Sequence, residues 1–459
     1  MNSELQQTQK ISVMEKIGYG LGDTAANLVW RTMMVFLPIF YTDVFGLSAA
    51  AVGTLLLVCR YWDGITDYIM GLIADRTRTR WGRFRPWVLW TALPFGVMTV
   101  LTFTTPDLDY SSKLIYAYAT YSGLILVYTA NNIPYSALTG VISADPAERT
   151  SLSSYRFIFA FLGGIITQGF NIYLVAFFGA GNDIRGYQMT MTLFAALSVA
   201  LFVITFLTTR ERVQPAASEN PSILEDSKDL IRNKAWLMLF GIGVLWVTFT
   251  TLKQGVTLFY FKYYLNDMSL APPFMILGLL AAMAGAALTR PLTDRFGKKW
   301  SMIYCLVVAL VSSALLFLAG PTDVALIFLL SSITELSTGP VITIFFAMLA
   351  DAADYSEWKN NRRATGLVFS AGTLSMKFGT GVAGALTGWL LMLFGYAANV
   401  AQTAEALLGI RLLISVFPAV AALLLIIVVR FYPLDEERLR EIEQDLLERR
   451  KGLPEPVSM

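Results

Sequence analysis

Residues 74–86 read ADRTRTRWGRFRP and separate two long apolar runs, at 49–74 and 86–105. In the second half of the chain, residues 294–299 (DRFGKK) repeat the order of acidic residue, basic residue and glycine. This stretch also follows an apolar run, at 272–293. A helix that crosses a bilayer needs roughly 20 mostly apolar residues. Both basic stretches are therefore predicted to be loops between membrane-spanning helices.

Apolar runs of sufficient length to cross a membrane recur along the whole chain. Twelve are predicted, at 17–43, 49–74, 86–105, 113–143, 152–177, 187–208, 236–264, 272–293, 300–320, 322–350, 366–395 and 405–431. Composition agrees, since 15% of the residues are charged and the mean hydropathy is +0.57, whereas soluble domains carry about 25% charged residues. The first 15 residues lack the apolar core and cleavage site of a signal peptide, so we expect the first span to be retained.

Lys and Arg are concentrated in alternate loops. The basic segments are 10–16, 76–85, 149, 210–234, 295–299, 359–363 and 438–451. The intervening loops at 44–48, 266–271 and 396–404 contain no Lys or Arg. Positively charged loops stay in the cytoplasm, so both termini are predicted to be cytoplasmic. The sequence thus predicts an all-α membrane protein with an even number of spans.

The longest polar interruption, at 209–235, divides the chain into two halves. We interpret it as a cytoplasmic linker between two six-helix bundles, at 1–208 and 236–433, and residues 434–459 as a cytoplasmic tail. The repeated basic loop lies at equivalent points of the two halves. Repeated halves with a binding site between them at mid-membrane are typical of secondary transporters.

The repeated loop resembles the cytoplasmic motif of the major facilitator superfamily. That resemblance implies a charge latch that holds neighbouring helix ends in one conformation. Its candidate residues are Asp75, Arg76, Arg83, Asp294 and Arg295. The alternative is a basic loop that only sets topology, but the two aspartates would then be superfluous.

Two carboxylates fall in the middle of the second predicted span. Asp63 and Asp67 are four residues apart, so both point from one face of the helix. Paired buried carboxylates repel each other unless a cation or a proton lies between them. Arg60, one turn earlier, can neutralise only one of them. The pattern favours a site for a coupling cation over a purely structural ion pair.

Single charges also fall inside other predicted spans. They are Asp23, Arg31, Arg156, Lys253, Glu335 and Lys377. Lys377 is a candidate partner for one of the two carboxylates, because a lone buried ammonium would lose its proton. Arg31 and Lys253 have two open interpretations. Each is either paired with Asp23 or Glu335, or lines a hydrated cavity that binds an anionic or hydroxyl-rich substrate.

The fourth predicted span is unusually polar. It carries Tyr128, Thr129, Asn131 and Asn132, followed by Pro134. Proline loosens a helix locally, and the amides can bind hydroxyl groups. Amide, phenol and cationic side chains suit a sugar better than a drug or a lipid.

Several motifs, in order along nearly the whole chain, resemble the glycoside–pentoside–hexuronide:cation symporters, which are melibiose-permease-like members of the major facilitator superfamily. The motifs are YGxGD at 19–23, FYTDVFG at 40–46, WDxxTD at 62–67, TRWGRFRP at 79–86, NIPY at 132–135, DAADYSEW at 351–358 and FYPL at 431–434. The resemblance implies a major facilitator fold with twelve helices in a bacterial cytoplasmic (inner) membrane, and cation-coupled uptake of a sugar.

The resemblance also assigns roles to residues. The cation-binding candidates are Asp63, Asp67, Thr66 and Thr129. The substrate-binding candidates, which include the unassigned buried cations, are Asn27, Arg31, Tyr128, Asn132, Arg156, Lys253, Thr373 and Lys377. Lys377 matches a lysine between the family's cation and sugar sites. The coupling cation is H⁺ or Na⁺, with no other cofactor and no metal site.

The sequence departs from the melibiose-transporting members at the sugar site. Asn27 and Asn132 stand where those members have aspartates, and Ala26, Ser136 and Ile342 replace a lysine and two tryptophans. Galactoside recognition in that mode is therefore not expected. The loss of two carboxylates favours an anionic sugar, such as a uronide or a sulfonated sugar. A neutral xyloside is the alternative.

Other classes of function fit less well. A lipid or lysolipid transporter of the same fold would need a more apolar cavity, and a membrane sensor or scaffold would need an appended domain. An enzyme is not expected: the chain has no His, and its two Cys, Cys59 and Cys305, lie within predicted spans without metal-ligand spacing. The expected partners are a small sugar or sugar acid, the cation and the lipid bilayer. Nucleic acid is not expected, and the chain is predicted to be a monomer.

Overall fold

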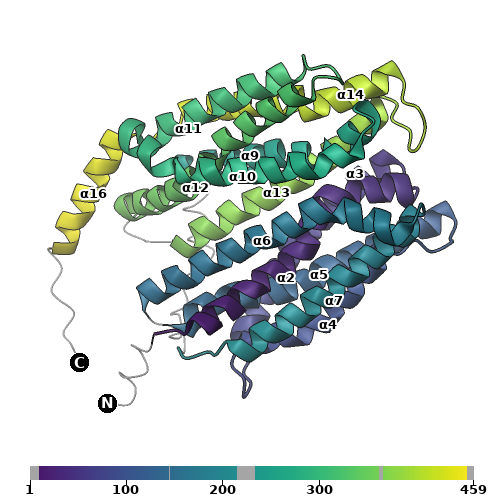
Figure 1. Ribbon diagram of the computed structural model, residues 1–459. Helices are drawn as coiled ribbons and strands as arrows, with labels where there is room; N and C mark the ends of the chain where they lie inside the picture. Colours follow the sequence, from purple (N-terminus) through teal and green to yellow (C-terminus); the bar gives the residue numbers. More distant parts are fainter. Residues whose placement is uncertain (1–9, 144, 214–232, 361–364, 452–459) are drawn as a thin grey trace. The chain divides into compact units, whose positions relative to one another are not determined.

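The computed structural model describes residues 10–143, 145–213, 233–360 and 365–451. Throughout this described part the regular elements are helices (Figure 1). They divide into two compact units. The first unit comprises Met1–Ala217, Gln254–Ile276 and Gly384–Ile410, and the second comprises Ser218–Lys253, Leu277–Ala383 and Arg411–Met459.

The first unit is built mainly from the N-terminal half of the chain. Its elements are α2 (Val13–Ile39), η1 (Phe40–Val44), α3 (Ala49–Arg76), α4 (Arg85–Thr102), α5 (Tyr110–Ile142), α6 (Pro146–Gly179), α7 (Asp183–Thr208), η2 (Tyr260–Tyr264) and η3 (Met268–Leu270). Helix α2 packs against both α6 and α7, while α4 packs between α5 and α7 (Figure 1). The first unit also includes the last residues of α9 (Lys234–Phe259) and of α13 (Thr365–Leu393) and the first residues of α10 (Ala271–Ala287), together with most of α14 (Ala404–Ile414).

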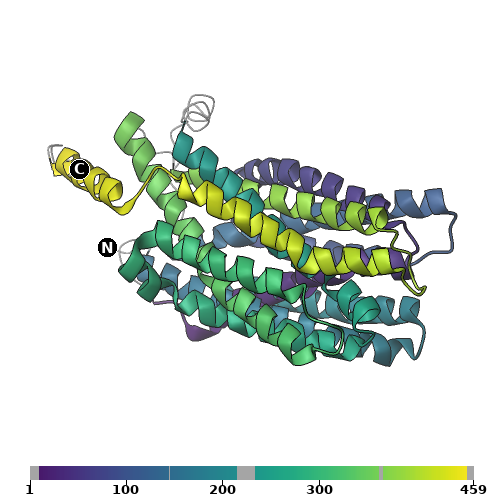
Figure 2. The ribbon, with the colours of Figure 1, turned by 90° about the horizontal axis from the view of Figure 1, so that it is seen from above.

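The second unit holds the rest of the C-terminal half. Besides most of α9, α10 and α13, it contains α11 (Thr289–Leu316), α12 (Val324–Asn360), α15 (Val416–Arg430) and α16 (Glu436–Lys451). Helix α11 packs against α12 and α15. The chain bends between α15 and α16 (Figure 2), and α16 packs against α12. Ile442 and Leu446 of α16 join the hydrophobic core of this unit.

Polar caps fix where the helices of the first unit begin. The Ser12 hydroxyl accepts the Glu15 N–H at the start of α2, and the Ser48 hydroxyl accepts the Ala51 N–H at the start of α3. The Asp145 carboxylate caps α6 in the same way. Each cap satisfies an N–H group that the helix itself leaves unpaired, so short polar residues between apolar runs determine the positions of the site helices.

In the described part of the chain, eight helices are long and apolar enough to cross a membrane; they extend over 147–179, 183–208, 234–264, 268–287, 289–316, 324–359, 372–393 and 404–430. Helices α2, α3, α4 and α5 are not among them. Helix α3 carries Arg60, Asp63 and Asp67 in its middle. The predicted twelve spans and cytoplasmic termini stay predictions.

Candidate transport site

The two predicted coupling carboxylates share one hydroxyl group. Asp63 and Asp67 project from α3, and the Thr129 hydroxyl of α5 lies 3.2 Å from Asp63 Oδ1 and 3.0 Å from Asp67 Oδ1. A hydroxyl has one hydrogen, so it can satisfy only one of these oxygens at a time. The Asp63 side chain is 1% exposed. A small cation or a proton in this position would reduce the repulsion between two carboxylates held against one oxygen.

Thr66, the fourth cation-site candidate, is bound differently. It is buried on α3, and its hydroxyl donates to the Asp63 carbonyl oxygen at 3.1 Å. This hydrogen bond uses the single hydroxyl proton and leaves the oxygen free to act as an acceptor. Thr66 therefore lies beside the carboxylate pair, and its recorded hydrogen bond goes to the main chain of Asp63 and not to a carboxylate.

Arg60 balances the charge of Asp63. Its Nη1 lies 3.3 Å from Asp63 Oδ2, and its Nη2 donates to the Tyr121 hydroxyl at 3.4 Å. The guanidinium also lies 4.4 Å from the centre of the Trp30 ring. Burying such a pair is costly unless its hydrogen bonds are satisfied, and here the tyrosine, the indole and the Met34 sulfur, 3.6 Å from Nη2, supply further contacts.

A second polar cluster joins α2, α5 and α6. Arg156 of α6 forms an ion pair with Asp23 of α2 and donates to the Ser136 hydroxyl at 3.1 Å. Ser136 donates to Asn132 Oδ1 at 3.3 Å, and Asn132 Nδ2 donates to the Tyr128 hydroxyl at 2.6 Å. The cluster therefore brings together three of the predicted substrate ligands, Tyr128, Asn132 and Arg156, and balances the arginine with a carboxylate that the sequence did not pair with it.

Trp30 connects the two clusters and was missed by sequence analysis. Its ring stacks on Tyr128, with the ring centres 4.5 Å apart, while Arg60 of the carboxylate cluster lies against the same indole. Asn27 is three residues before Trp30 and therefore on the same face of α2. That spacing was the only signal in the sequence that pointed to this tryptophan.

The two predicted substrate candidates on α2, Asn27 and Arg31, have different environments. The Asn27 amide donates to the Asp23 carbonyl oxygen at 2.9 Å. Arg31, four residues later, is half-buried, and Tyr128 is its titratable neighbour. Among the residues that the structure describes, no acidic side chain forms an ion pair with Arg31. Arg31 thus lies within a predicted span, and none of the described acidic residues balances its charge.

The remaining substrate candidates lie in the second unit. Lys253 Nζ is 2.8 Å from Glu335 Oε1 of α12, and the lysine side chain is 6% exposed. The sequence left this pairing open against a role in substrate binding, and the structure contains the ion pair. Thr373 and Lys377 are one turn apart on α13, and the Thr373 hydroxyl donates to the Ser370 carbonyl oxygen.

The predicted latch residues lie at the surface of their own units. Asp75 and Arg76 are exposed at the end of α3. Asp294 is 69% exposed and lies 3.6 Å from the even more exposed Arg290. An exposed pair of this kind contributes about 0–1 kcal/mol. The assignment of a latch to these aspartates stays a prediction.

Each basic loop is instead fixed by a glutamate that sequence analysis missed. The Glu211 carboxylate accepts the main-chain N–H groups of Arg83, Phe84 and Arg85 at 2.7–2.8 Å. Gly82 has φ +114°, and a Cβ there would lie 2.3 Å from the Glu211 carboxyl carbon. The backbone can therefore approach the carboxylate only with glycine at this position.

The second unit repeats this arrangement. Glu436 accepts the Lys298 N–H at 3.0 Å beside Gly297, whose φ is +73°. The Lys298 ammonium also pairs with Asp351 of α12 at 2.6 Å. Glu211 follows the last predicted span of the first half, and Glu436 follows the last span of the second half. This common position is the signal that sequence analysis overlooked.

Comparison with known proteins identifies the family. A model of the MFS/sugar transport protein family matches residues 18–436. The chain belongs to this family. It is 38% identical to the putative glycoside/cation symporter YagG of Escherichia coli over 98% of both chains. It is 38% identical to the isoprimeverose transporter of Lactiplantibacillus pentosus, over 94% of this chain and 91% of the relative. It is 32% identical to the glucuronide carrier protein homolog of Escherichia coli, over 98% and 99%.

Solved transporters have the same fold at low identity. A bacterial homolog of the lysosomal transporter Spinster superposes with a TM-score of 0.66 at 15% identity, covering 94% of this chain and 97% of the other. Tetrameric PepTSo2 superposes with a TM-score of 0.68 at 11% identity, covering 94% of this chain and 99% of the other. The chain is therefore an all-helical membrane protein with a fold of the major facilitator type.

These findings confirm the resemblance seen in the sequence. The chain is a secondary transporter of sugar-type substrates and not an enzyme. It is a multi-pass protein of a bacterial inner membrane.

Proposed function

We propose that this chain imports a sugar derivative together with H⁺ or Na⁺ by alternating access. In this proposal it has twelve spans in two six-helix bundles, has both termini in the cytoplasm, and works as a monomer. The proposal that transport is coupled to a cation rests on one observation: Asp63 and Asp67 share hydrogen bonding to one threonine hydroxyl.

The two carboxylates and Thr129 supply oxygen ligands, which suit both Na⁺ and a proton. Arg60 is already bound to Asp63 at 3.3 Å, so an entering cation meets one carboxylate with a fixed partner and a second carboxylate one turn away. Binding of the cation reduces the repulsion between them. Helices α3 and α5 then hold their polar faces together, and α5 carries Tyr128 and Asn132 on the substrate side.

For the substrate, the described contacts favour an anionic sugar. Asn132, Tyr128 and Asn27 offer amide and phenol groups for hydroxyls, while Arg31 offers a guanidinium with no acidic partner in the described part of the first unit. A charge-assisted hydrogen bond contributes about 1.5–3 kcal/mol, which a uronate carboxylate or a sulfonate would gain. The glucuronide carrier protein homolog among the relatives is consistent with such a substrate.

A neutral xyloside is the second candidate. Two of the other three cations of the predicted substrate site are balanced within their own units, Arg156 by Asp23 and Lys253 by Glu335. A site in which these two charges are already compensated has less need of an anionic ligand. One of the relatives is an isoprimeverose transporter, which is named for a sugar and not for a sugar acid.

The coupling proposal is tested in proteoliposomes with Asp63→Asn and Asp67→Asn. We expect each variant to lose uphill accumulation driven by a cation gradient while sugar exchange at equal concentrations continues. Undiminished accumulation in both inserted variants would refute the carboxylate pair as the coupling site. Repeating the wild-type assay with a Na⁺ gradient alone and a pH gradient alone identifies the cation.

A further inference from the structure

A buried carboxylate lies at the end of the first unit that is remote from the basic loops. Helix α2 begins beside the Glu15–Arg212 ion pair, in the region of those loops, and runs for 27 residues, about 40 Å, to η1. Asp43 is in η1, and its side chain is 2% exposed. Asp43 belongs to the FYTDVFG motif at 40–46.

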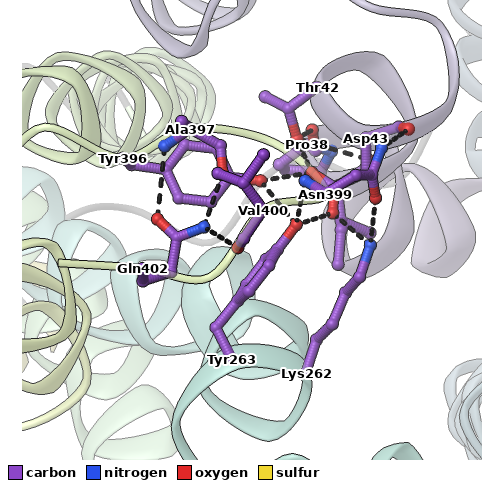
Figure 3. A network of polar contacts seen from close by, with 11 residues as sticks. Pro38, Thr42, Asp43, Lys262, Tyr263, Tyr396, Ala397, Asn399, Val400 and Gln402 are labelled. Carbon is purple, nitrogen blue, oxygen red and sulfur yellow. Dashed lines mark hydrogen bonds and ion pairs between the residues drawn. The ribbon is translucent and has the colours of Figure 1, made fainter.

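The Asp43 carboxylate accepts hydrogen bonds from three separate segments (Figure 3). Lys262 and Tyr263 of η2 both donate to Oδ2, and Tyr396, from the loop after α13, donates to Oδ1. The neighbouring Thr42 hydroxyl donates to Oδ1 at 2.7 Å. Protein donors thus take the place of water around the buried carboxylate, and most of these donors come from the second half of the sequence.

Asn399 closes the network around the carboxylate (Figure 3). Its amide nitrogen donates to the Asp43 carbonyl oxygen at 2.6 Å, and its Oδ1 accepts from Lys262 at 2.8 Å. Its main-chain N–H donates to the Tyr263 hydroxyl at 2.9 Å. Burial and the Asp43 charge raise the pKa of Tyr396, so this hydroxyl stays protonated as a donor. Every member is therefore linked to at least one other.

The two sides of the network are internal equivalents. Segments η1 and η2 are both five-residue π-helical turns that directly follow a long helix, and they begin at residues 40 and 260, 220 positions apart. The repeated basic loops are 219 positions apart, from Asp75 to Asp294. This repeat makes Asp43 the counterpart of Tyr263, and the two side chains contact each other. Single π turns are rare and occur frequently at functional sites.

The backbone packs closely beside the network. A Cβ on Gly388 of α13 would lie 2.2 Å from the Ala49 carbonyl oxygen of α3, and a Cβ on Gly53 would lie 2.9 Å from the Ala385 oxygen. Trp389 donates to the Thr54 hydroxyl at 3.1 Å. At this end the last part of α13 therefore lies directly against the first part of α3, with no side chain between the two backbones.

We propose that Asp43, Lys262, Tyr263 and Tyr396 form a latch that closes this end of the transporter, and that the latch opens to water once in every transport cycle. When η1 separates from η2 and from the loop after α13, the Asp43 carboxylate loses Lys262, Tyr263 and Tyr396 at once, and water must replace these donors. A buried charge that loses its partner without water costs several kcal/mol, so intermediate states are disfavoured. The arrangement is consequently two-state, as a gate requires.

The position of the latch indicates which face it closes. It lies at the opposite end of α2 from the basic loops, and positive loops face the cytoplasm. The latch therefore closes the outer face. It involves none of the proposed cation or substrate ligands, so its test does not depend on which sugar or cation is carried.

The test measures access to a buried position next to the latch. Val52 of α3 is 2% exposed, and Val52→Cys introduces a thiol there in a background carrying Cys59→Ala and Cys305→Ala. A membrane-impermeant maleimide is added to right-side-out and, separately, to inside-out vesicles without sugar. We expect Asp43→Asn to raise the labelling rate from the outer face about tenfold or more, because it removes charge-assisted bonds. Labelling from the inner face should not rise.

Milder and control variants keep the result interpretable. Tyr396→Phe removes one donor and should raise labelling several-fold, while Lys262→Gln added to Asp43→Asn should have little further effect, since both belong to one network. Arg185→Gln, an exposed cation at the same end, is the matched control and should label like wild type. Wild-type labelling in inserted Asp43→Asn and Tyr396→Phe would overturn the latch and leave a static structural network.

Discussion

The Trp30 ring stacks on Tyr128 with centres 4.5 Å apart, and the planes are 22° from parallel. Arg60, which is bound to Asp63, lies 4.4 Å from the centre of the same indole. One side chain of α2 therefore contacts both the carboxylate cluster and the predicted substrate cluster.

We expect Trp30→Ala to weaken the coupling between cation and sugar more than it weakens either binding event alone. An aromatic pair contributes about 0.5–1.5 kcal/mol beyond its buried area, so the factor by which the cation raises sugar affinity should fall roughly three- to tenfold. By linkage, the effect of sugar on cation affinity should fall equally. Binding titrations of sugar with and without cation, and the reverse, measure both factors.

Trp30→Phe is the control, because it keeps an aromatic ring and should retain most of the coupling. A structural role alone would lower sugar affinity by the same factor with and without cation. That outcome would remove Trp30 from the coupling.

Asp63→Asn should destabilise the protein through Arg60. The substitution keeps the shape of the side chain but leaves a buried guanidinium without its carboxylate, which costs about 3–5 kcal/mol. Adding Arg60→Gln should recover part of this loss, because the unpaired charge is then removed. Thermal unfolding of the two single variants and the double variant in detergent measures the recovery. Additive destabilisation would mean that the 3.3 Å contact contributes little.

Arg31→Gln and Lys253→Gln should have different effects on an anionic sugar. Lys253 already has Glu335 at 2.8 Å, whereas the described acidic residues leave Arg31 unmatched. We expect Arg31→Gln to weaken binding of a uronide or sulfonated sugar roughly tenfold, which corresponds to about 1.4 kcal/mol, and to change a neutral xyloside much less. Lys253→Gln should affect both sugars alike.

A panel of anionic and neutral sugars, titrated into wild type and both variants, provides this comparison. A wild type that prefers neutral sugars, with the same preference retained in Arg31→Gln, would favour the xyloside alternative.

The helices and the carboxylate pair were predictable because their signals are local. The i, i+4 spacing of Asp63 and Asp67 holds for any helix, and apolar runs predict spans directly. Pairings between distant helices were not predictable: Asp23 and Arg156 are 133 positions apart, and the sequence contains no register between their helices. Lys253 and Glu335 stayed open for the same reason.

The π turns have no sequence signal of their own. Asp43 lies in a motif shared with the family, but its burial depends on η1, η2 and a loop meeting at one point. A network of this kind follows from tertiary packing, and only its internal spacing of 220 residues was present in the sequence.

Glu211→Gln should destabilise the basic loop of the first half more than Asp75→Asn does. Glu211 accepts three main-chain N–H groups at 2.7–2.8 Å, and the loss of its charge weakens all three bonds, whereas Asp75 is exposed. Charge-assisted bonds contribute about 1.5–3 kcal/mol each at most, so we expect a loss of about 2 kcal/mol against a few tenths for Asp75→Asn. Glu436→Gln, with one such bond to Lys298, should fall between them.

Thermal unfolding together with limited proteolysis between residues 77 and 84 measures the effect. Faster cleavage in Glu211→Gln, but not in Asp75→Asn, would identify the glutamate as the anchor of the loop. Equal cleavage and equal stability in the two variants would mean that Glu211 anchors the loop no better than Asp75, one of the latch residues predicted from the sequence. Transport rates of the same variants then separate anchoring from gating, because an anchor alone lowers stability without shifting the balance between inward-facing and outward-facing states.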